Sequence, residues 1–269
     1  ALPGVKEVFI HPGMGDVGVG TGAALQVAWQ NGPIASHHLE NVYLGPEYSD
    51  GEIKKTLNRH KLNYTKVNQL EKEIAELLAQ GKIIGRFNGR MEYGPRALGN
   101  RSILVQAADH GINDALNKKL HRTEFMPFAP VILIEEANKC FIGADKARHA
   151  AQFMTITFDC TDFMKRTMPA AVHIDGTARP QLVAREVNPS YYQIIEEYQE
   201  LTGIPGVVNT SFNMHEEPIV CTPEDAVRGF LDGKLDYLAI GNYLVALPKE
   251  KSAAEYEPSE ENGSTGKIS

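Results

Sequence analysis

Residues 82–104 read KIIGRFNGRMEYGPRALGNRSIL, and this stretch decides how the rest of the chain is interpreted. A glycine-rich loop separates two short apolar runs, and it contains or adjoins four arginines: Arg86, Arg90, Arg96 and Arg101. Glycine lets the backbone approach a ligand closely, and guanidinium groups offer paired donors that fit phosphate or carboxylate oxygens. The pattern therefore favours a strand–loop–strand cradle for an anion over a solvated turn with surface arginines.

The charge of the chain is distributed unevenly. The formal net charge is −7, which argues against a general nucleic-acid-binding protein. Residues 82–122 nevertheless hold eight Lys or Arg and three acidic residues, a net +5, which leaves −12 on the remainder. A local basic site on an acidic body suits a small anionic ligand, so we expect no nucleic-acid partner.

Composition places the chain among ordinary globular proteins, with 42% hydrophobic and 23% charged residues. Its length suits one large or two small domains. No apolar run approaches the roughly 20 residues that span a membrane, and no signal-peptide pattern is present, so we expect a cytoplasmic protein with no membrane partner. The three widely spaced cysteines suggest neither a disulfide framework nor a metal site. The opening at Ala1 suggests a truncated or processed product.

The glycine-rich segment HPGMGDVGVGTGAAL, residues 11–25, follows a predicted strand at 5–10. We expect a flexible glycine turn that leads into a helix at 23–30. Such a turn before a helix N-terminus is a natural phosphate site, because free N–H groups and the helix dipole face the anion. Asp16 inside it is either a metal ligand or a turn aspartate. The candidate nucleotide contacts are Gly15, Gly18, Gly20 and Gly22.

The remaining pattern alternates helices and strands without strict order, which is typical of a mixed, twisted sheet with packed helices, an α/β fold. A capping box at Ser49 predicts a helix to about residue 60. Apolar spacing at 67–78 predicts an amphipathic helix. Further helices are predicted at 110–120, 135–141, 189–202 and 222–231, and strands at 130–134, 153–159, 204–210, 237–240 and 243–247. Within 170–184, the Asp175–Gly176 pair predicts a turn between two strands.

Three polar clusters, at 118–122, 173–181 and 209–213, border apolar runs. Each could lie at a sheet edge, where α/β ligand sites are usually found. His173 and Asp175 would share a face of a strand, although a structural His–Asp turn fits as well. Asn209 and Ser211 are either ligand contacts or strand-end caps. The set suits binding of an acyl phosphate better than a hydrolytic triad.

Four long motifs carry a family resemblance: GRMEYGPRALGNRSIL, RTEFMPFAP, HIDGTARPQLV and NTSFNMHEEPIVCTPEDA. In this order they resemble the C-terminal part of the O-carbamoyltransferases of nodulation-factor and antibiotic-tailoring type, and the likeness runs from about residue 5 to 247. It implies a YrdC-like domain at 49–248. Before it, residues 1–48 resemble the end of an actin-like (ASKHA) ATPase domain with a connector, and 249–269 would form a flexible tail.

The resemblance implies an activity in two steps. The YrdC-like domain would form carbamoyl adenylate from carbamoyl phosphate and ATP with Mg²⁺. The actin-like domain would then pass the carbamoyl group to a hydroxyl of a small-molecule acceptor, with a metal, usually iron, beside the nucleotide. This chain would carry only the first half-reaction, because most of the actin-like domain is missing, and a homodimer is a further expectation. The alternative is a YrdC-type nucleotide- or RNA-binding module without turnover.

Site residues also follow from the resemblance. Ser211 and Asn213 match a Ser-x-Asn pair, and Arg122 matches the arginine of a basic pair. Leu120 stands where many relatives carry lysine, so Lys118 or Lys119 would substitute. Asp16 matches an aspartate metal ligand, although its HxxxH partners are absent from this sequence. Arg96 and Arg179 would hold carbamoyl phosphate or the adenylate, with further substrate contacts from Arg90, Arg101, Lys118, His173, Asp175, Thr177 and Asn209.

Overall fold

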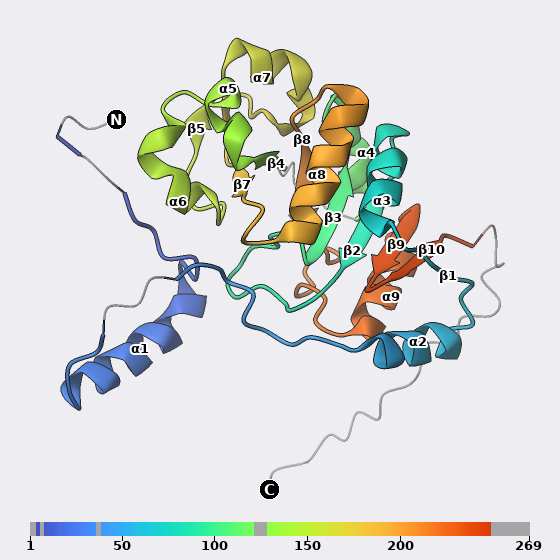
Figure 1. The fold of residues 1–269 in the computed structure, drawn as a ribbon, viewed down its shortest axis with the longest axis horizontal. Helices are drawn as coiled ribbons and strands as arrows, with labels where there is room; N and C mark the ends of the chain where they lie inside the picture. Colours follow the sequence, from blue (N-terminus) through green and yellow to red (C-terminus); the bar gives the residue numbers. More distant parts are fainter. Residues whose placement is uncertain (1–3, 6–7, 36–38, 121–127, 249–269) are drawn as a thin grey trace, which may run out of the picture.

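The computed structural model describes residues 4–5, 8–35, 39–120 and 128–248. Its centre is an eight-stranded mixed sheet with the strand order β1-β10-β9-β2-β3-β8-β4-β7 (Figure 1). Neighbours β9 and β2, and β4 and β7, run parallel, and the other pairs run antiparallel. The predicted α/β class with a twisted mixed sheet is confirmed. The predicted 249–269 tail lies outside the described residues.

The strands of this sheet are short and mostly buried. The predicted final hairpin is confirmed, because β9 pairs antiparallel with β10 around Gly241 and Asn242. The strands are β1 (Thr65–Lys66), β2 (Ile84–Phe87), β3 (Arg101–Val105), β4 (Ala129–Leu133), β7 (Gln181–Val183), β8 (Gly206–Ser211), β9 (Tyr237–Ile240) and β10 (Tyr243–Ala246).

Two helices cover one face of the sheet, α3 (Leu70–Ala79) and α8 (Pro189–Thr202), as Figure 1 shows. Their apolar sides, including Ile74 and Tyr191, pack on strand residues such as Leu104. Both helices were predicted from sequence, and α8 has the expected proline at its start and a left-handed glycine after its end.

The other helices surround the larger core cluster. The predicted capping box is present at Ser49, where α2 (Asp50–Arg59) begins. A second box caps α9 (Pro223–Asp232) at Thr222, where a helix start was predicted. The further helices are α4 (Gly111–Lys119), α5 (Ala137–Cys140), α6 (Arg148–Ala151), α7 (Asp162–Thr167) and α9 (Pro223–Asp232), with 3₁₀ turns η1 (Ile134–Glu136), η2 (Ala144–Ala147) and η3 (Pro169–Ala171). Among the described residues, none of the helices is long and apolar enough to cross a membrane.

Helix α1 (Asp16–Gln30) stands beside the sheet domain, and none of its residues is buried (Figure 1). The predicted flexible turn across 13–22 is wrong, because Gly18, Gly20 and Gly22 lie inside this helix. Residues 12–15, which include Gly13 and Gly15, keep a turn conformation, and Gly15 at the N-cap has a φ of 81°. The strand predicted at 5–10 is also wrong for its described residues, 5 and 8–10.

Two strand predictions in the second half of the chain need correction. Only β5 (Phe158–Asp159) forms within 153–159, and Met154 there has a left-handed φ of 56° that interrupts an extended chain. The turn at Asp175–Gly176 is present, but it does not join two paired strands. A proline starts η3 before it, and Pro180 separates β6 (Thr177–Ala178), which pairs with β5, from β7 in the main sheet.

Candidate anion-binding site

A cavity of about 290 Å³ opens beside the end of β8 and the loop that follows β2. We call it the anion cavity. It brings together five of the residues predicted from sequence: Arg96, Arg179, Asn209, Ser211 and Asn213. The other lining residues are Pro95, Ala97, Phe128, Ala129, Met154, Thr210, His215 and Glu216. Its size is near the lower end for small-molecule sites, so it suits a compact ligand.

Arg96 and Arg179 give the anion cavity its positive charge. Neither arginine forms an ion pair with a described acidic residue, and the Nε atom of each is buried without a hydrogen-bond partner. Burial, and then the charge of Arg96, lower the pKa of Arg179 to about 10. Both groups remain cationic at neutral pH. Two adjacent, partly desolvated cations without an ion-pair partner among the described residues favour an anionic ligand.

The loop that presents Arg96 is shaped by one buried carboxylate. Oε1 of Glu92 accepts hydrogen bonds from the backbone N–H groups of Leu98 at 2.7 Å, Asn100 at 2.7 Å and Arg101 at 3.2 Å. Burial raises the pKa of Glu92, although these N–H donors and Arg101 oppose the rise. The side chain thus folds residues 93–101 into a compact turn with Arg96 on the cavity side.

Glycine is required at one bend of this turn. Gly99 has a φ of 117°, and a Cβ atom there would lie 2.3 Å from the Tyr191 ring. The sequence motif therefore uses this glycine for backbone conformation and for close packing on α8, rather than for contact with a ligand.

Ser211 and Asn213 lie at the opposite side of the cavity, at the end of β8. The Ser211 hydroxyl donates to Oδ1 of Asn213 at 2.6 Å, and Nδ2 of Asn213 donates to the carbonyls of Met214 and Glu217. The asparagine therefore fixes the loop after β8 and orients the hydroxyl. Glu216 in this loop has a left-handed φ of 64°, an unfavourable conformation that often occurs at ligand sites.

Arg86 and Arg101 are buried in the framework of the fold. We expected Arg101 to contact substrate, but its side chain is not part of the cavity lining. Its Nη atoms donate to four backbone carbonyls, and its guanidinium stacks on Phe87 at 3.7 Å. Burial lowers the pKa of Arg101 to about 10. Its role is to tie loop 88–100 to the segment before α2.

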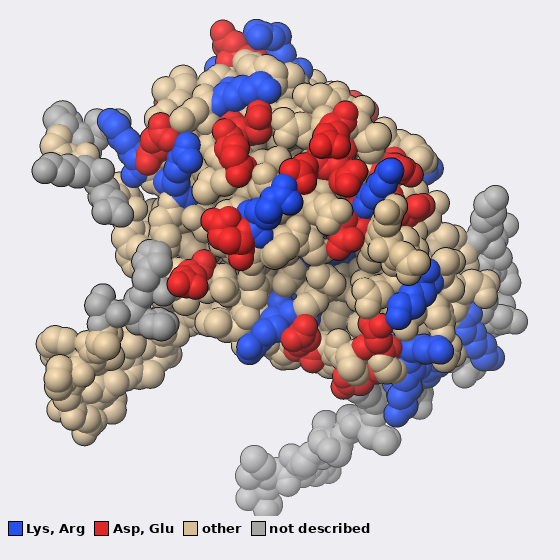
Figure 2. Space-filling view, in the orientation of Figure 1, with Lys and Arg blue, Asp and Glu red and all other residues tan. Residues whose placement is uncertain are grey.

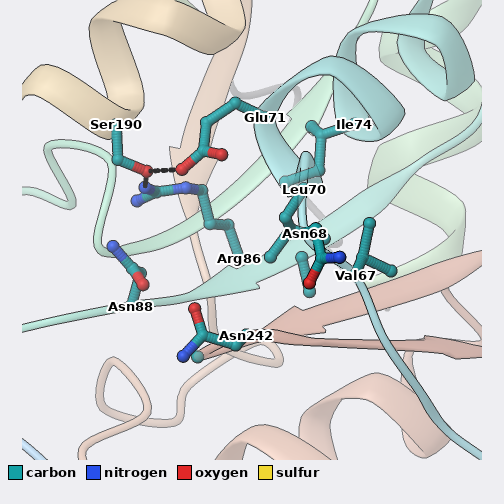
Figure 3. Close-up of a pocket in the computed structure, with 11 residues that line it drawn as sticks. Val67, Asn68, Leu70, Glu71, Ile74, Arg86, Asn88, Ser190 and Asn242 are labelled. Carbon is teal, nitrogen blue, oxygen red and sulfur yellow. Dashed lines mark hydrogen bonds between the residues drawn. The ribbon is translucent and has the colours of Figure 1, made fainter.

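Arg86 points to the other side of the sheet, into a small polar pocket of about 60 Å³ (Figure 3). Its guanidinium donates to Ser190, whose hydroxyl donates in turn to Glu71, and the labelled side chains show this chain of contacts. Arg86 also bonds to the Gly99 carbonyl and the Asn100 side chain. It therefore fastens α3 and α8 to the same loop.

Two other predicted basic contacts lie away from the anion cavity. Arg90 is exposed and donates to the carbonyls of Leu44 and Gly45, so it holds the connector before α2. Lys118 is exposed on α4, and Lys119 donates to the Lys234 carbonyl. Neither lysine is among the residues that line the cavity, and Leu120 is fully buried in the core. Arg122 lies outside the described residues.

The His173–Thr177 segment forms a structural turn. Oδ1 of Asp175 accepts from the Thr177 backbone N–H at 3.0 Å and from its hydroxyl at 2.8 Å, and these bonds lower the pKa of Asp175. Burial lowers the pKa of His173. His173, Asp175 and Thr177 are not among the residues that line the described cavity, and their contact with substrate stays a prediction. Their turn instead precedes β6 and Arg179.

The N-terminal nucleotide and metal predictions find no site among the described residues. Asp16 is exposed at the start of α1, and the described part of the chain holds no group of three or more His, Cys, Asp or Glu residues suited to a metal. These residues do not fit an iron centre by themselves. On the face drawn in Figure 2, uncharged residues cover most of α1, and Asp16 is the only charged residue in its sequence.

Sequence reasoning missed Glu92 and Gln181. Glu92 was counted only as one acid in a basic segment, and Gln181 only as the end of a polar cluster. Both are buried polar side chains with backbone partners on the Arg96 loop. A signal was available, since each lies in a motif that also supplies a cavity arginine.

The fold and the site together define an α/β protein with a cavity that is lined by two arginines. The chain belongs to the carbamoyltransferase C-terminus family, whose model matches residues 75–247.

Among curated relatives, uncharacterized protein MJ1058 of Methanocaldococcus jannaschii is 42% identical over 248 residues, covering 89% of this chain and 40% of that protein. Nodulation protein NolNO of Sinorhizobium fredii is 37% identical over 246 residues, covering 89% and 36%. Nodulation protein NolO of Bradyrhizobium diazoefficiens is 36% identical over 244 residues, covering 89% and 44%. The chain spans less than half the length of these relatives.

Solved structures give a weaker likeness. Full-length HypF in its phosphate- and nucleotide-bound form aligns with a TM-score of 0.44 and 20% identity, covering 66% of this chain and 25% of that chain. Sua5 of P. abyssi complexed with L-threonine aligns with a TM-score of 0.44 and 14% identity, covering 64% and 46%. At that TM-score the likeness carries no weight for fold or function.

Proposed function

We propose that this chain binds carbamoyl phosphate in the anion cavity and uses ATP to convert its carbamoyl group to carbamoyl adenylate. The observation that supports this most directly is the pair Arg96 and Arg179, which line the cavity without an acidic partner among the described residues. Membership of the carbamoyltransferase C-terminus family adds the substrate class.

The proposed reaction has two balanced steps. Water attacks the phosphorus of carbamoyl phosphate, the bond between that phosphorus and the carbamoyl oxygen breaks, and carbamate, inorganic phosphate and a proton are released. A carbamate oxygen then attacks the α-phosphorus of ATP, the bond between the α-phosphorus and its bridging oxygen breaks, and pyrophosphate leaves. Neither step needs a protein nucleophile, so positioning and charge stabilisation are the contributions asked of the protein.

Each cavity side chain then has a defined task. The two arginines bind phosphate oxygens and offset the repulsion between two polyanionic substrates, with Mg²⁺ entering as part of the ATP complex. The Ser211 hydroxyl, held by Asn213 at 2.6 Å, lies where it can rotate to donate to a ligand oxygen. Removing one preorganised donor of this type typically costs about 10²- to 10³-fold in rate.

We also propose that the complete protein transfers the carbamoyl group to a hydroxyl of a small-molecule acceptor. The transfer step and its iron centre would depend on sequence outside this chain, since Asp16 has no described metal-binding neighbours. We place the reaction in the cytoplasm, where ATP is available to it.

The test is to incubate the chain with carbamoyl phosphate, ATP and Mg²⁺ and to follow phosphate and pyrophosphate release. We expect release that requires both substrates and that is lost in Arg179→Ala and Ser211→Ala. Arg90→Ala is the matched control, because Arg90 comes from the same loop but does not line the cavity. Thermal stabilisation by carbamoyl phosphate without release would contradict turnover by this chain. Absence of both release and stabilisation would overturn the proposal as a whole.

A further inference from the structure

A chain of buried amides lies behind the anion cavity. Gln181, which is 2% exposed, donates from Nε2 to the Leu98 carbonyl at 2.7 Å. Asn209, which is 1% exposed, donates from Nδ2 to Oε1 of Gln181 at 2.8 Å and to the Ala97 carbonyl at 3.2 Å. The two carbonyls belong to the residues that directly follow Arg96.

These contacts fix which end of each amide faces which way. A backbone carbonyl can only accept, so the NH₂ group of Gln181 must face Leu98, and its oxygen must face Asn209. That oxygen and the Ala97 carbonyl can also only accept, so the NH₂ group of Asn209 must face them. The Oδ1 atom of Asn209 is therefore turned away from all three.

Oδ1 of Asn209 has no hydrogen-bond partner in the described structure, although its residue lines the anion cavity. A buried acceptor without a partner typically costs about 1 to 3 kcal/mol, so a ligand that supplies an N–H group is favoured at this position. The same cavity offers cationic donors on Arg96 and Arg179. A ligand that matches both features has an anionic group at one end and an NH₂ group at the other.

We propose that Gln181 is a positioning residue that holds Oδ1 of Asn209 ready to accept a hydrogen bond from the carbamoyl NH₂ group. This inference rests on the proposed function and extends it to substrate selection. It explains how the site would distinguish carbamoyl phosphate from acetyl phosphate, which has a methyl group in place of the NH₂ group. Because Ala97 and Leu98 follow Arg96 directly, one loop carries both the Arg96 guanidinium and the two carbonyls that orient Oδ1 of Asn209.

Binding of three probes tests the inference: carbamoyl phosphate, acetyl phosphate and inorganic phosphate, each titrated by calorimetry. We expect the wild-type chain to prefer carbamoyl over acetyl phosphate by about tenfold or more, the worth of one satisfied hydrogen bond. Gln181→Leu should reduce the preference to below about threefold, because the Asn209 amide can then turn. Affinity for inorganic phosphate should stay within about twofold, since the arginines are unchanged.

Tyr43→Phe is the matched control. The Tyr43 hydroxyl donates to the same Leu98 carbonyl at 2.9 Å but does not touch Asn209, so this variant should keep the carbamoyl preference. If both variants lowered the preference equally, Gln181 would have only a structural role, and the inference would be wrong. Should Gln181→Leu not fold, Asn209→Leu is expected to remove the preference in its place, and an unchanged preference there would overturn the inference.

The inference and the proposed function fail in different ways. Wild-type protein that binds both acyl phosphates equally would overturn selection by Asn209 and leave the anion site in place. Wild-type protein that binds none of the three probes would overturn the proposed function, and the inference with it.

Discussion

Two buried framework arginines, Arg86 and Arg101, and two cavity arginines, Arg96 and Arg179, have opposite environments. Arg86 and Arg101 are 2% and 0% exposed, and their Nη donors meet carbonyls, an amide and a hydroxyl of the protein itself. Arg96 lies in the same segment but has no described acceptor, as does Arg179 from a distant part of the chain. The comparison shows that the number of arginines in a motif does not indicate which of them bind a ligand. What separates them is whether the fold already supplies their acceptors.

Replacing a framework arginine should have the largest effect on stability. Arg101→Met would leave four carbonyls without their donor, and we expect a loss of about 3 to 5 kcal/mol in the free energy of unfolding. Urea denaturation measures this as a lower midpoint with an unchanged slope. Arg90→Met, with an exposed guanidinium, should cost less than about 1 kcal/mol. Equal losses in the two variants would contradict the division.

Replacing a cavity arginine should separate binding from stability. Arg179→Met removes a partly desolvated cation that has no ion-pair partner among the described residues, so the melting temperature should stay the same or rise. Affinity for carbamoyl phosphate or turnover should fall by about 10²- to 10³-fold. Thermal melts with and without carbamoyl phosphate measure both quantities. If the melting temperature of Arg179→Met fell as far as that of Arg101→Met, Arg179 would have the same structural role as Arg101.

Glu92 links the two groups, and its protonation gives a pH-dependent prediction. Its folded-state pKa is raised from 4.5 by burial, so stability is fully present below pH 4.5 and declines as pH rises through the folded value. Glu92→Gln keeps an acceptor for the three backbone N–H groups but cannot ionise. Its stability relative to wild type should therefore increase with pH across that window.

Urea midpoints between pH 4 and 8 measure this effect. Glu92→Leu is the control that removes the acceptor altogether, and it should be less stable than Glu92→Gln at every pH. A Glu92→Gln curve parallel to that of the wild type would show that Glu92 is ionised in both states.

The smallest effects are expected outside both groups. Lys118→Met changes an exposed side chain on α4 that does not line the anion cavity, so stability should change by less than about 0.5 kcal/mol. Affinity for carbamoyl phosphate should change by less than about twofold. A tenfold loss of affinity for carbamoyl phosphate would show that Lys118 contacts the substrate, as the sequence suggested.

Local patterns predicted much of the fold. The capping box at Ser49, the helix start at Thr222, the amphipathic spacing of 67–78 and the Gly241–Asn242 turn depend on neighbours within a few residues, and all are present. The flexible turn predicted for the glycine-rich N-terminal segment was wrong at Gly18, Gly20 and Gly22, because glycine lowers helix propensity without preventing a helix. The strands that form within 153–159 and 170–184 depend on pairing with distant segments. Alternation of apolar and polar residues within one segment does not reveal that pairing.

The candidate site followed from sequence only in part. Motif resemblance brought Arg96, Arg179, Ser211 and Asn213 to attention, and the structure places them around one cavity. The sequence did not indicate that Arg101 and the His173 turn lie outside the cavity lining, because burial and backbone acceptors depend on tertiary contacts. The amide chain through Gln181 joins residues that are 28 and 83 positions apart, so no local pattern could have indicated it.

Helix α1 has a practical consequence for spectroscopy. The chain contains one tryptophan, Trp29, and it is 64% exposed on this helix. Its intrinsic fluorescence therefore reports on whatever surrounds α1 and not on the interior of the sheet domain. A red-shifted emission would be expected for the chain alone, and a blue shift on adding another protein would give the contact of α1 directly, without a label. Unfolding of the core would have to be followed by tyrosine absorbance or circular dichroism instead.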